Sequence, residues 1–192
     1  MPGRCSSSFS SLLSISRSNY YGAMDEVDRI VSEWQRERPD LDVAPMEVVS
    51  RVSRLAKLLD RARKDIFASH GLDVWSFDVL SALRRAGAPY QLSPSKLTEQ
   101  MMVTSGTMTN RIDRLVSAGL VTRSPDPGDR RGVRVQLTGD GLAKVDGAML
   151  DFLEREHELM SSMTGAQTRR LADLLRTMSA SFDLQIMRDS ED

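Results

Sequence analysis

The sequence has few of the residues that build metal sites, disulfide frameworks or membrane spans. Its 192 residues include one cysteine, Cys5, and two isolated histidines, His70 and His157. A single cysteine excludes an intramolecular disulfide and a zinc site with several cysteine ligands. We therefore expect no metal and no cofactor. No apolar run reaches the roughly 18 residues of a transmembrane helix, so we expect a protein without membrane spans in a reducing, cytoplasmic setting.

Aromatic residues are also few, at 5% of the sequence, and the formal net charge is −1. The low aromatic content argues against a base-stacking platform of the kind that binds single-stranded RNA. The near-neutral charge hides a basic segment, because Ser93 to Leu137 contains seven Lys or Arg and four Asp or Glu, a local net charge of +3. Binding phosphates needs positive charge only where contact occurs, so a nucleic-acid partner is compatible with the overall charge.

Motifs of enzymatic chemistry are missing as well. The sequence contains no Gly-rich phosphate loop, no nucleophile elbow and no cluster of His, Asp and Glu at metal-ligand spacing. Hydrophobic residues at 40% and charged residues at 28% are typical of a globular protein. We therefore do not expect an enzyme.

Residues 1–23 are rich in serine, contain Arg4 and Arg17, and have no acidic residue. Such a composition imitates a targeting peptide, but the apolar run at residues 12–15 is too short and too interrupted for a secretory core. We expect this segment to be a disordered tail, or an upstream extension of a chain that truly starts at Met24.

Two amphipathic regions bracket the middle of the chain. A short acidic helix is expected from Asp25 to about Arg36, followed by a long helix from about Pro45 to Ser69. The long helix carries an apolar seam with a period of 3.5 residues, typical of helices that pair with other helices. The members of this seam are Val48, Val52, Leu55, Leu59, Ala62 and Ile66.

Two further helices are predicted near the C-terminus, beginning at Thr138 and Thr164, both of which are suited to cap a helix. Their apolar stripes are Leu142, Val145, Met149 and Phe152 on the first, and Leu171, Leu175, Met178 and Phe182 on the second. Such seams pack either within one chain or across a two-fold axis. We favour the second, with residues 24–71 and 138–188 forming the dimerisation helices of a homodimer.

The central block, residues 72–137, contains three shorter helices and a hairpin. The first helix covers about residues 76–85, and the second opens with Ser93 as N-cap followed by Pro94 at the first helical position. The third is capped by Thr104 or Ser105 and ends at an Ala-Gly signal at residues 118–119. Helix, tight turn and helix at this spacing predict a helix-turn-helix.

The third of these helices has a polar face that suits a DNA groove. Met108, Ile112 and Leu115 recur at helical spacing and are expected to face the core. The residues predicted to contact DNA lie on the other side: Ser105, Thr107, Thr109, Asn110, Arg111 and Arg114. Asparagine can pair with adenine in the major groove, and arginine can reach guanine or phosphate. The alternative is a polar face that only meets solvent.

A hairpin follows, with strands at about residues 121–124 and 132–137 joined by a tip rich in turn formers. The tip ends in Asp129, Arg130 and Arg131. Adjacent arginines suit the narrow, electronegative minor groove. We expect Asp129 to orient an arginine through a charged hydrogen bond.

Several apolar residues in and near these helices are candidates for the core or for a ligand cleft. Trp75 and Phe77 either line an effector cleft or belong to the core between domains. Met101, Met102 and Met108 are expected to fill the core.

The segment from Gly106 to Gly141 resembles the MarR family of transcriptional regulators. The tip from Asp129 to Arg131, followed by Leu137-Thr138 and Gly141, is similar to the wing motif of that family. The long bracketing helices match its dimerisation domain, so the resemblance extends over about residues 45–188.

The resemblance implies a mainly α (α+β) fold: a winged helix-turn-helix with terminal helices that form a homodimer. It implies binding to pseudo-palindromic double-stranded DNA, usually as a repressor, with Arg131 as the wing arginine and Asp129 as its acidic partner. Many members release DNA when a small phenolic or anionic molecule binds. One branch senses oxidants through a cysteine in the first long helix, where this sequence has none. A winged-helix module that contacts other proteins, without a DNA role, is the alternative.

Overall fold

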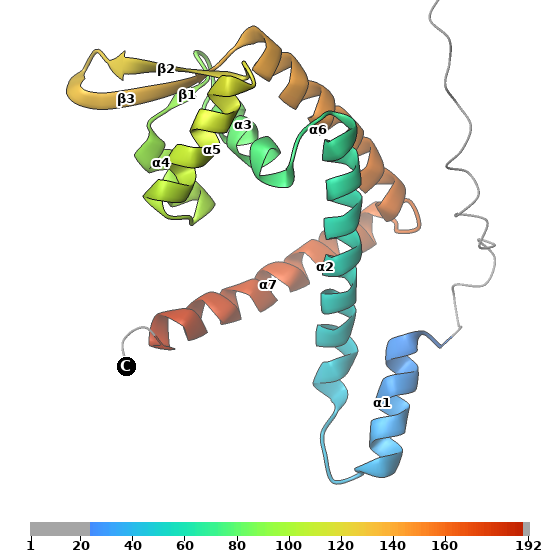
Figure 1. Ribbon diagram of the computed structural model, residues 1–192. Helices are drawn as coiled ribbons and strands as arrows, with labels where there is room; N and C mark the ends of the chain where they lie inside the picture. The colour runs from blue at the N-terminus through green and yellow to red at the C-terminus, as the bar shows by residue number, and fades with distance from the viewer. Residues whose placement is uncertain (1–23, 190–192) are drawn as a thin grey trace, which may run out of the picture. The chain divides into compact units, whose positions relative to one another are not determined.

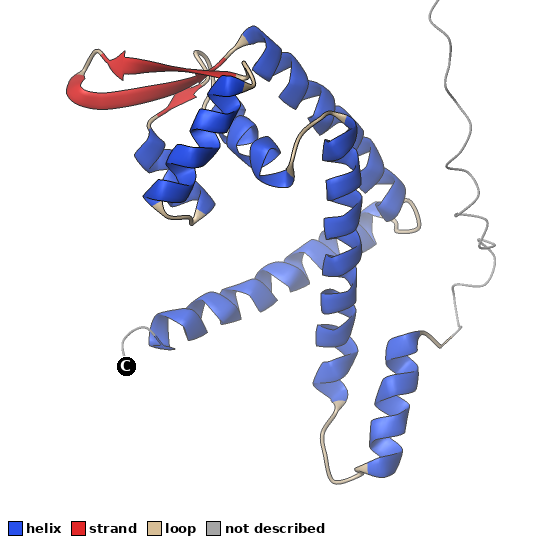
Figure 2. Cartoon of the chain, viewed as in Figure 1, coloured by secondary structure: helices blue, strands red, loops and turns tan. Residues whose placement is uncertain are grey.

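The computed structural model describes residues 24–189, apart from the side chains of residues 129–131 and 181–189. The described chain is mainly helical and has one small antiparallel sheet (Figures 1 and 2). Its elements are α1 (Glu26–Glu37), α2 (Ala44–Ser69), α3 (Val74–Arg85), β1 (Gln91–Leu92), α4 (Pro94–Met101), α5 (Ser105–Ser117), β2 (Val121–Asp126), β3 (Asp129–Leu137), α6 (Gly139–Met160) and α7 (Gly165–Asp189). The described residues divide into two compact units, 24–60 and 61–189.

The first unit holds α1 against the beginning of α2 through a small apolar cluster and an ionic contact. Val27, Val31 and Val43 are buried together. Asp25 caps α1, because its carboxylate accepts hydrogen bonds from backbone N–H groups of the first turn. The guanidinium of Arg51 on α2 donates to the same carboxylate at 2.8 Å and to that of Asp28 at 2.6 Å.

The second unit contains the main core, to which α3, α4, α5, α6 and the sheet all contribute. The predicted caps are confirmed: Ser93 accepts from the N–H of Lys96 at the start of α4, and Thr104 accepts from that of Thr107 at the start of α5. The turn between these helices passes through Met102, whose backbone is left-handed with a φ of 50°. These caps and this turn fix the angle at which α5 leaves α4.

The expectation that Met102 fills the core is wrong, because its side chain is 92% exposed. The left-handed backbone of the turn directs it away from the core. Met108 is fully buried as expected, and Met101 packs against the core from its edge.

The three strands form an antiparallel sheet in the order β1-β3-β2. The hairpin of β2 and β3 is longer than predicted, and in its register Asp126 lies opposite Asp129. This places the turn at Pro127 and Gly128. The two-residue strand β1 pairs Leu92 with Val135, and no sequence pattern predicts so short a strand.

A close junction ties the end of α5 to the start of α6. Thr138, predicted as the cap of α6, accepts from the N–H of Gly141 and donates its hydroxyl to the carbonyl of Gly119. A Cβ added at Gly141 would overlap the carbonyl oxygen of Leu120. Glycine is therefore required where α6 passes over the beginning of the hairpin.

The apolar stripe of α6 packs within the chain. Val145 is buried, and Leu142, Met149 and Phe152 lie against the core. Phe152 meets an aromatic pair in which the rings of Phe67 and Phe77 stack with centroids 3.9 Å apart. Among residues 24–189, no helix is long and apolar enough to span a membrane.

Candidate nucleic-acid interface

Helix α5 presents a polar face because three apolar residues fix its rotation on the core. Met108, Ile112 and Leu115 are each at most 2% exposed. Of the α5 residues predicted to contact DNA, all are exposed except Arg111, which is half-buried. The phase of the apolar stripe thus decides which side chains face outward.

The polar side chains on this face are not equally available to a ligand. The hydroxyls of Thr104 and Thr107 lie 2.9 Å apart, and Thr109 donates its hydroxyl to the carbonyl of Ser105. Within the described part of the chain, the side chain of Asn110 has no hydrogen-bond partner. Its amide can therefore offer both a donor and an acceptor to a ligand.

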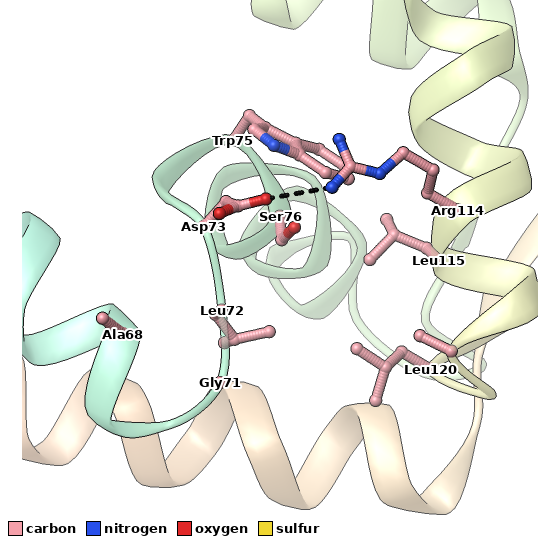
Figure 3. A pocket seen from close by; sticks show the side chains of 10 residues that line it. Ala68, Gly71, Leu72, Asp73, Trp75, Ser76, Arg114, Leu115 and Leu120 are labelled. Carbon is pink, nitrogen blue, oxygen red and sulfur yellow. Dashed lines mark hydrogen bonds and ion pairs between the residues drawn. The ribbon is translucent and has the colours of Figure 1, made fainter.

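Two arginines on one flank of α5 lie over the indole of Trp75 on α3. The guanidinium carbon of Arg114 is 4.7 Å from the ring centroid, and that of Arg111 is 5.6 Å away. These distances are within the range of cation–π attraction. Arg114 also approaches the carboxylate of Asp73 at 3.4 Å (Figure 3).

A shallow cavity of about 370 Å³ opens beside this arrangement. Asp73, Trp75 and Arg114 lie on its wall, and Leu115 and Leu120 contribute apolar surface (Figure 3). Phe77, the other residue considered for an effector cleft, does not line this cavity and is buried in the core, 4% exposed.

Ion pairs stabilise the hairpin, and the sequence pattern alone does not predict them. Arg134 on β3 donates to the carboxylate of Asp126 at 2.8 Å, and this hydrogen bond raises the pKa of the guanidinium. The same carboxylate accepts from the N–H of Gly128 across the turn. Asp126 therefore stabilises both the turn and the strand that follows it. The predicted partners at the tip, Asp129, Arg130 and Arg131, have side chains outside the described set.

A second ion pair connects the hairpin to α5. The guanidinium of Arg123 on β2 is 2.7 Å from the carboxylate of Asp113 on α5. The two candidate DNA-contacting elements are thus linked directly as well as through the core. Sequence alone shows charges of opposite sign at these positions but cannot pair them.

Comparison with known proteins identifies the family. Residues 70–132 match the model of the MarR family. The HTH-type transcriptional regulator PecS of Dickeya dadantii (strain 3937) is 42% identical over 150 residues, which are 78% of this chain and 90% of PecS. The chain belongs to the MarR family.

Other MarR-family proteins extend the comparison. The HTH-type transcriptional repressor NicR of Pseudomonas putida is 34% identical, over 72% of this chain and 88% of NicR. A mutant of MarR from E. coli, solved in complex with operator DNA, matches with a TM-score of 0.58 and 28% identity, covering 72% of this chain and 99% of that one. AbsC from Streptomyces coelicolor, with a TM-score of 0.65 and 18% identity, shares the fold.

These matches confirm the predicted membership of the MarR family and the predicted mainly helical winged helix-turn-helix fold. The family consists of transcriptional regulators. The residue-level assignments on α5 and on the hairpin stay predictions.

Proposed function

We propose that this MarR-family protein is a transcriptional regulator, acting as a repressor, that binds a pseudo-palindromic DNA operator as a homodimer. The observation that carries the proposal is the outward face of α5. There Asn110, whose side chain has no partner among the described residues, lies beside two arginines whose guanidinium carbons are 5.6 and 4.7 Å from the ring centroid of Trp75.

Helix α5 is the element that enters the major groove in this proposal. Asn110 is suited to pair with the N6 and N7 atoms of adenine, and Arg111 and Arg114 to reach guanine or phosphate. The small side chains Ser105 and Gly106 at the beginning of the helix let it approach the base edges. Contacts of this kind determine sequence preference, whereas phosphate contacts determine position.

The hairpin is the wing in this proposal and enters the adjacent minor groove.

Arg131→Ala should weaken binding chiefly at sites with A/T-rich flanks, whose narrow grooves attract arginine most. Arg131→Lys should restore little, because lysine lacks the planar fork. Asp129→Ala should also weaken binding, because the proposed role of Asp129 is to orient an arginine. Charge alone predicts the reverse, since removal of an acidic group near phosphates would strengthen binding. A gel-shift titration on matched A/T-rich and G/C-rich sites measures these effects, and an equal loss on both sites contradicts the minor-groove role.

A homodimer is supported by apolar residues that the chain itself leaves uncovered. On α2, Val48, Leu55 and Leu59 are 54%, 56% and 44% exposed, and they belong to the seam of period 3.5. On α7, Leu171 and Leu175 are 37% and 42% exposed. Large apolar side chains exposed at several positions along one helix face often mark a surface that contacts another protein. A two-fold dimer then explains the symmetry proposed for the operator.

A small-molecule effector is supported by the cavity beside Trp75. It combines an indole, the guanidinium of Arg114 and the carboxylate of Asp73 on a partly apolar wall. An aromatic anion bound there would compete for Arg114, a residue that this proposal also assigns to DNA. Titration of a protein–DNA complex with aromatic carboxylates, followed by fluorescence anisotropy of the labelled duplex, tests whether such a ligand releases DNA.

The decisive experiment is selection of bound duplexes from a random DNA pool by the purified protein. We expect an inverted repeat to be enriched, with an affinity that falls steeply with salt because phosphate contacts release counterions. Recovery of no preferred duplex at low salt would contradict the proposal. It would favour a winged-helix module that contacts other proteins.

A further inference from the structure

Trp75 lies between the main core and α5, the helix proposed to contact DNA. It is the second residue of α3, is half-buried, and packs against the main core. The guanidinium carbons of Arg111 and Arg114 on α5 lie over its ring, 5.6 and 4.7 Å from the centroid. These residues are 36 and 39 positions away in sequence and nearly one helical turn apart from each other on α5.

Asp73, the residue before α3, contributes to the same arrangement. It occupies the N-cap position of α3, but its carboxylate makes no capping hydrogen bond. The carboxylate instead lies 3.4 Å from the guanidinium of Arg114 (Figure 3). Arg114 is thus held on two sides, by the ring below it and by the carboxylate beside it.

From this geometry we propose that Trp75 is a positioning residue for sequence-specific DNA binding. Its indole face holds Arg111 and Arg114 in the orientation in which they meet the duplex. The inference rests on the proposed function and assigns a role in it to a residue outside the helix-turn-helix face. Free arginine side chains lose much rotational freedom on binding, and a side chain ordered beforehand loses less.

The role of Trp75 concerns sequence-specific contacts and leaves the general attraction between arginine charges and DNA unchanged. Replacing the indole leaves both guanidinium charges in place, so attraction to any duplex is retained. What is lost is their fixed direction, on which hydrogen bonds to base edges depend. A residue that only filled the core would affect all duplexes alike, through the stability of the domain.

The test compares Trp75→Leu and Trp75→Phe with wild type on two labelled duplexes, one selected from a random pool and one a scrambled version of it. Trp75→Leu should lose about tenfold in affinity for the selected duplex, because each of the two arginine side chains would then be ordered only on binding, at a cost of roughly threefold in affinity each. Its affinity for the scrambled duplex should be unchanged. Trp75→Phe keeps an aromatic face and should recover most of the loss. Trp34→Phe, which changes the other tryptophan of the chain, is the matched control and should bind like wild type.

A spectroscopic measurement tests the contact without relying on a destabilised variant. In the Trp34→Phe background, Trp75 is the only tryptophan, and Arg114→Ala should change its emission in the absence of DNA. Equal binding of wild type and Trp75→Leu, tighter binding by Trp75→Leu, or an equal loss on both duplexes overturns the positioning role, as does an emission spectrum insensitive to Arg114→Ala. If wild type itself prefers no duplex, the proposed function fails, and this inference fails with it.

Discussion

Asn110 is the residue on which base recognition by α5 depends most. It is exposed, has no side-chain partner within the described residues, and lies opposite the buried stripe of its helix. The neighbouring Thr107 and Thr109 have hydroxyls already engaged with Thr104 and Ser105. Among these polar residues, Asn110 therefore has the most hydrogen-bonding capacity left for a base.

Asn110→Ala should relax sequence preference at one position in each half-site, by about 1–3 kcal/mol of discrimination, because a paired contact to adenine is lost. Competition between duplexes that differ at single positions measures this effect. Ser117→Ala is a suitable control, since Ser117 lies on the same helix and donates its hydroxyl to the carbonyl of Asp113. Unchanged affinity and preference in Asn110→Ala would mean that this face of α5 does not enter the groove.

Gly141 lies where the packing of α6 leaves no room for a side chain. A methyl group at this position would overlap the backbone of Leu120, which a rotamer change cannot relieve. Gly141→Ala should therefore lower the free energy of unfolding by about 1–3 kcal/mol, the usual range for overpacking. Gly139→Ala, in the same helical turn and with open space around it, should be neutral or slightly stabilising. Urea denaturation of both variants checks the prediction, and equal stability would show that α6 can move away from the hairpin.

At the scale of elements, the contact between α1 and α2 includes the ionised carboxylate of Asp25. The hydrogen bond from Arg51 is the largest cause that lowers the pKa of Asp25 from its ordinary 3.8 to about 2, and the backbone hydrogen bonds of its capping role add to it. A carboxyl group with a lowered pKa stabilises the fold above its unfolded-state value. This stabilisation is lost as the pH falls through the folded-state value.

We therefore expect α1 to keep its full attachment above a pH of roughly 4 and to lose part of it between about 4 and 2. Hydrogen exchange of the α1 amides at several pH values measures this directly. Arg51→Met should raise exchange in α1 already at neutral pH and flatten the acid dependence. Arg29→Met, which removes exposed pairs within α1 alone, is the control. If hydrogen exchange in α1 depends on pH in the same way in Arg51→Met and wild type, groups other than Asp25 cause that dependence.

At the scale of the whole molecule, exposed apolar residues on α2 and on α7 are the surfaces that the proposed dimer would cover. The stripe of α6 is different, because the core of the same chain covers it. The two interpretations that the sequence left open therefore apply to different helices: packing within the chain for the stripe of α6, and pairing between chains, as proposed, for the seam of α2.

Leu55→Glu should convert the proposed dimer to monomers or unfold it, since the seam would bury a charge without a partner. Lys57→Glu introduces the same charge at an exposed position on another side of α2 and should leave the dimer intact. Light scattering at micromolar concentration reports the mass of each variant. A wild-type protein with the mass of one chain would contradict the dimer, as would a Leu55→Glu variant that remains dimeric.

The sequence by itself determined the helices, their caps and the outward face of α5. Ser93, Thr104 and Thr138 cap helices as predicted, and the spacing of Met108, Ile112 and Leu115 fixed the rotation of α5. Local hydrogen bonding and apolar periodicity act within one or two helical turns, so a short stretch of sequence contains them completely.

Tertiary structure decided what lies next to that face. The contacts of Trp75 with Arg111 and Arg114 and the burial of Phe77 depend on how segments distant in sequence are oriented. The same holds for β1, whose two residues form a strand only because β3 lies alongside. An apolar side chain favours burial over contact with water, and the sequence shows this tendency. Only the packed fold determines which group it contacts, such as a phenylalanine ring or a guanidinium group.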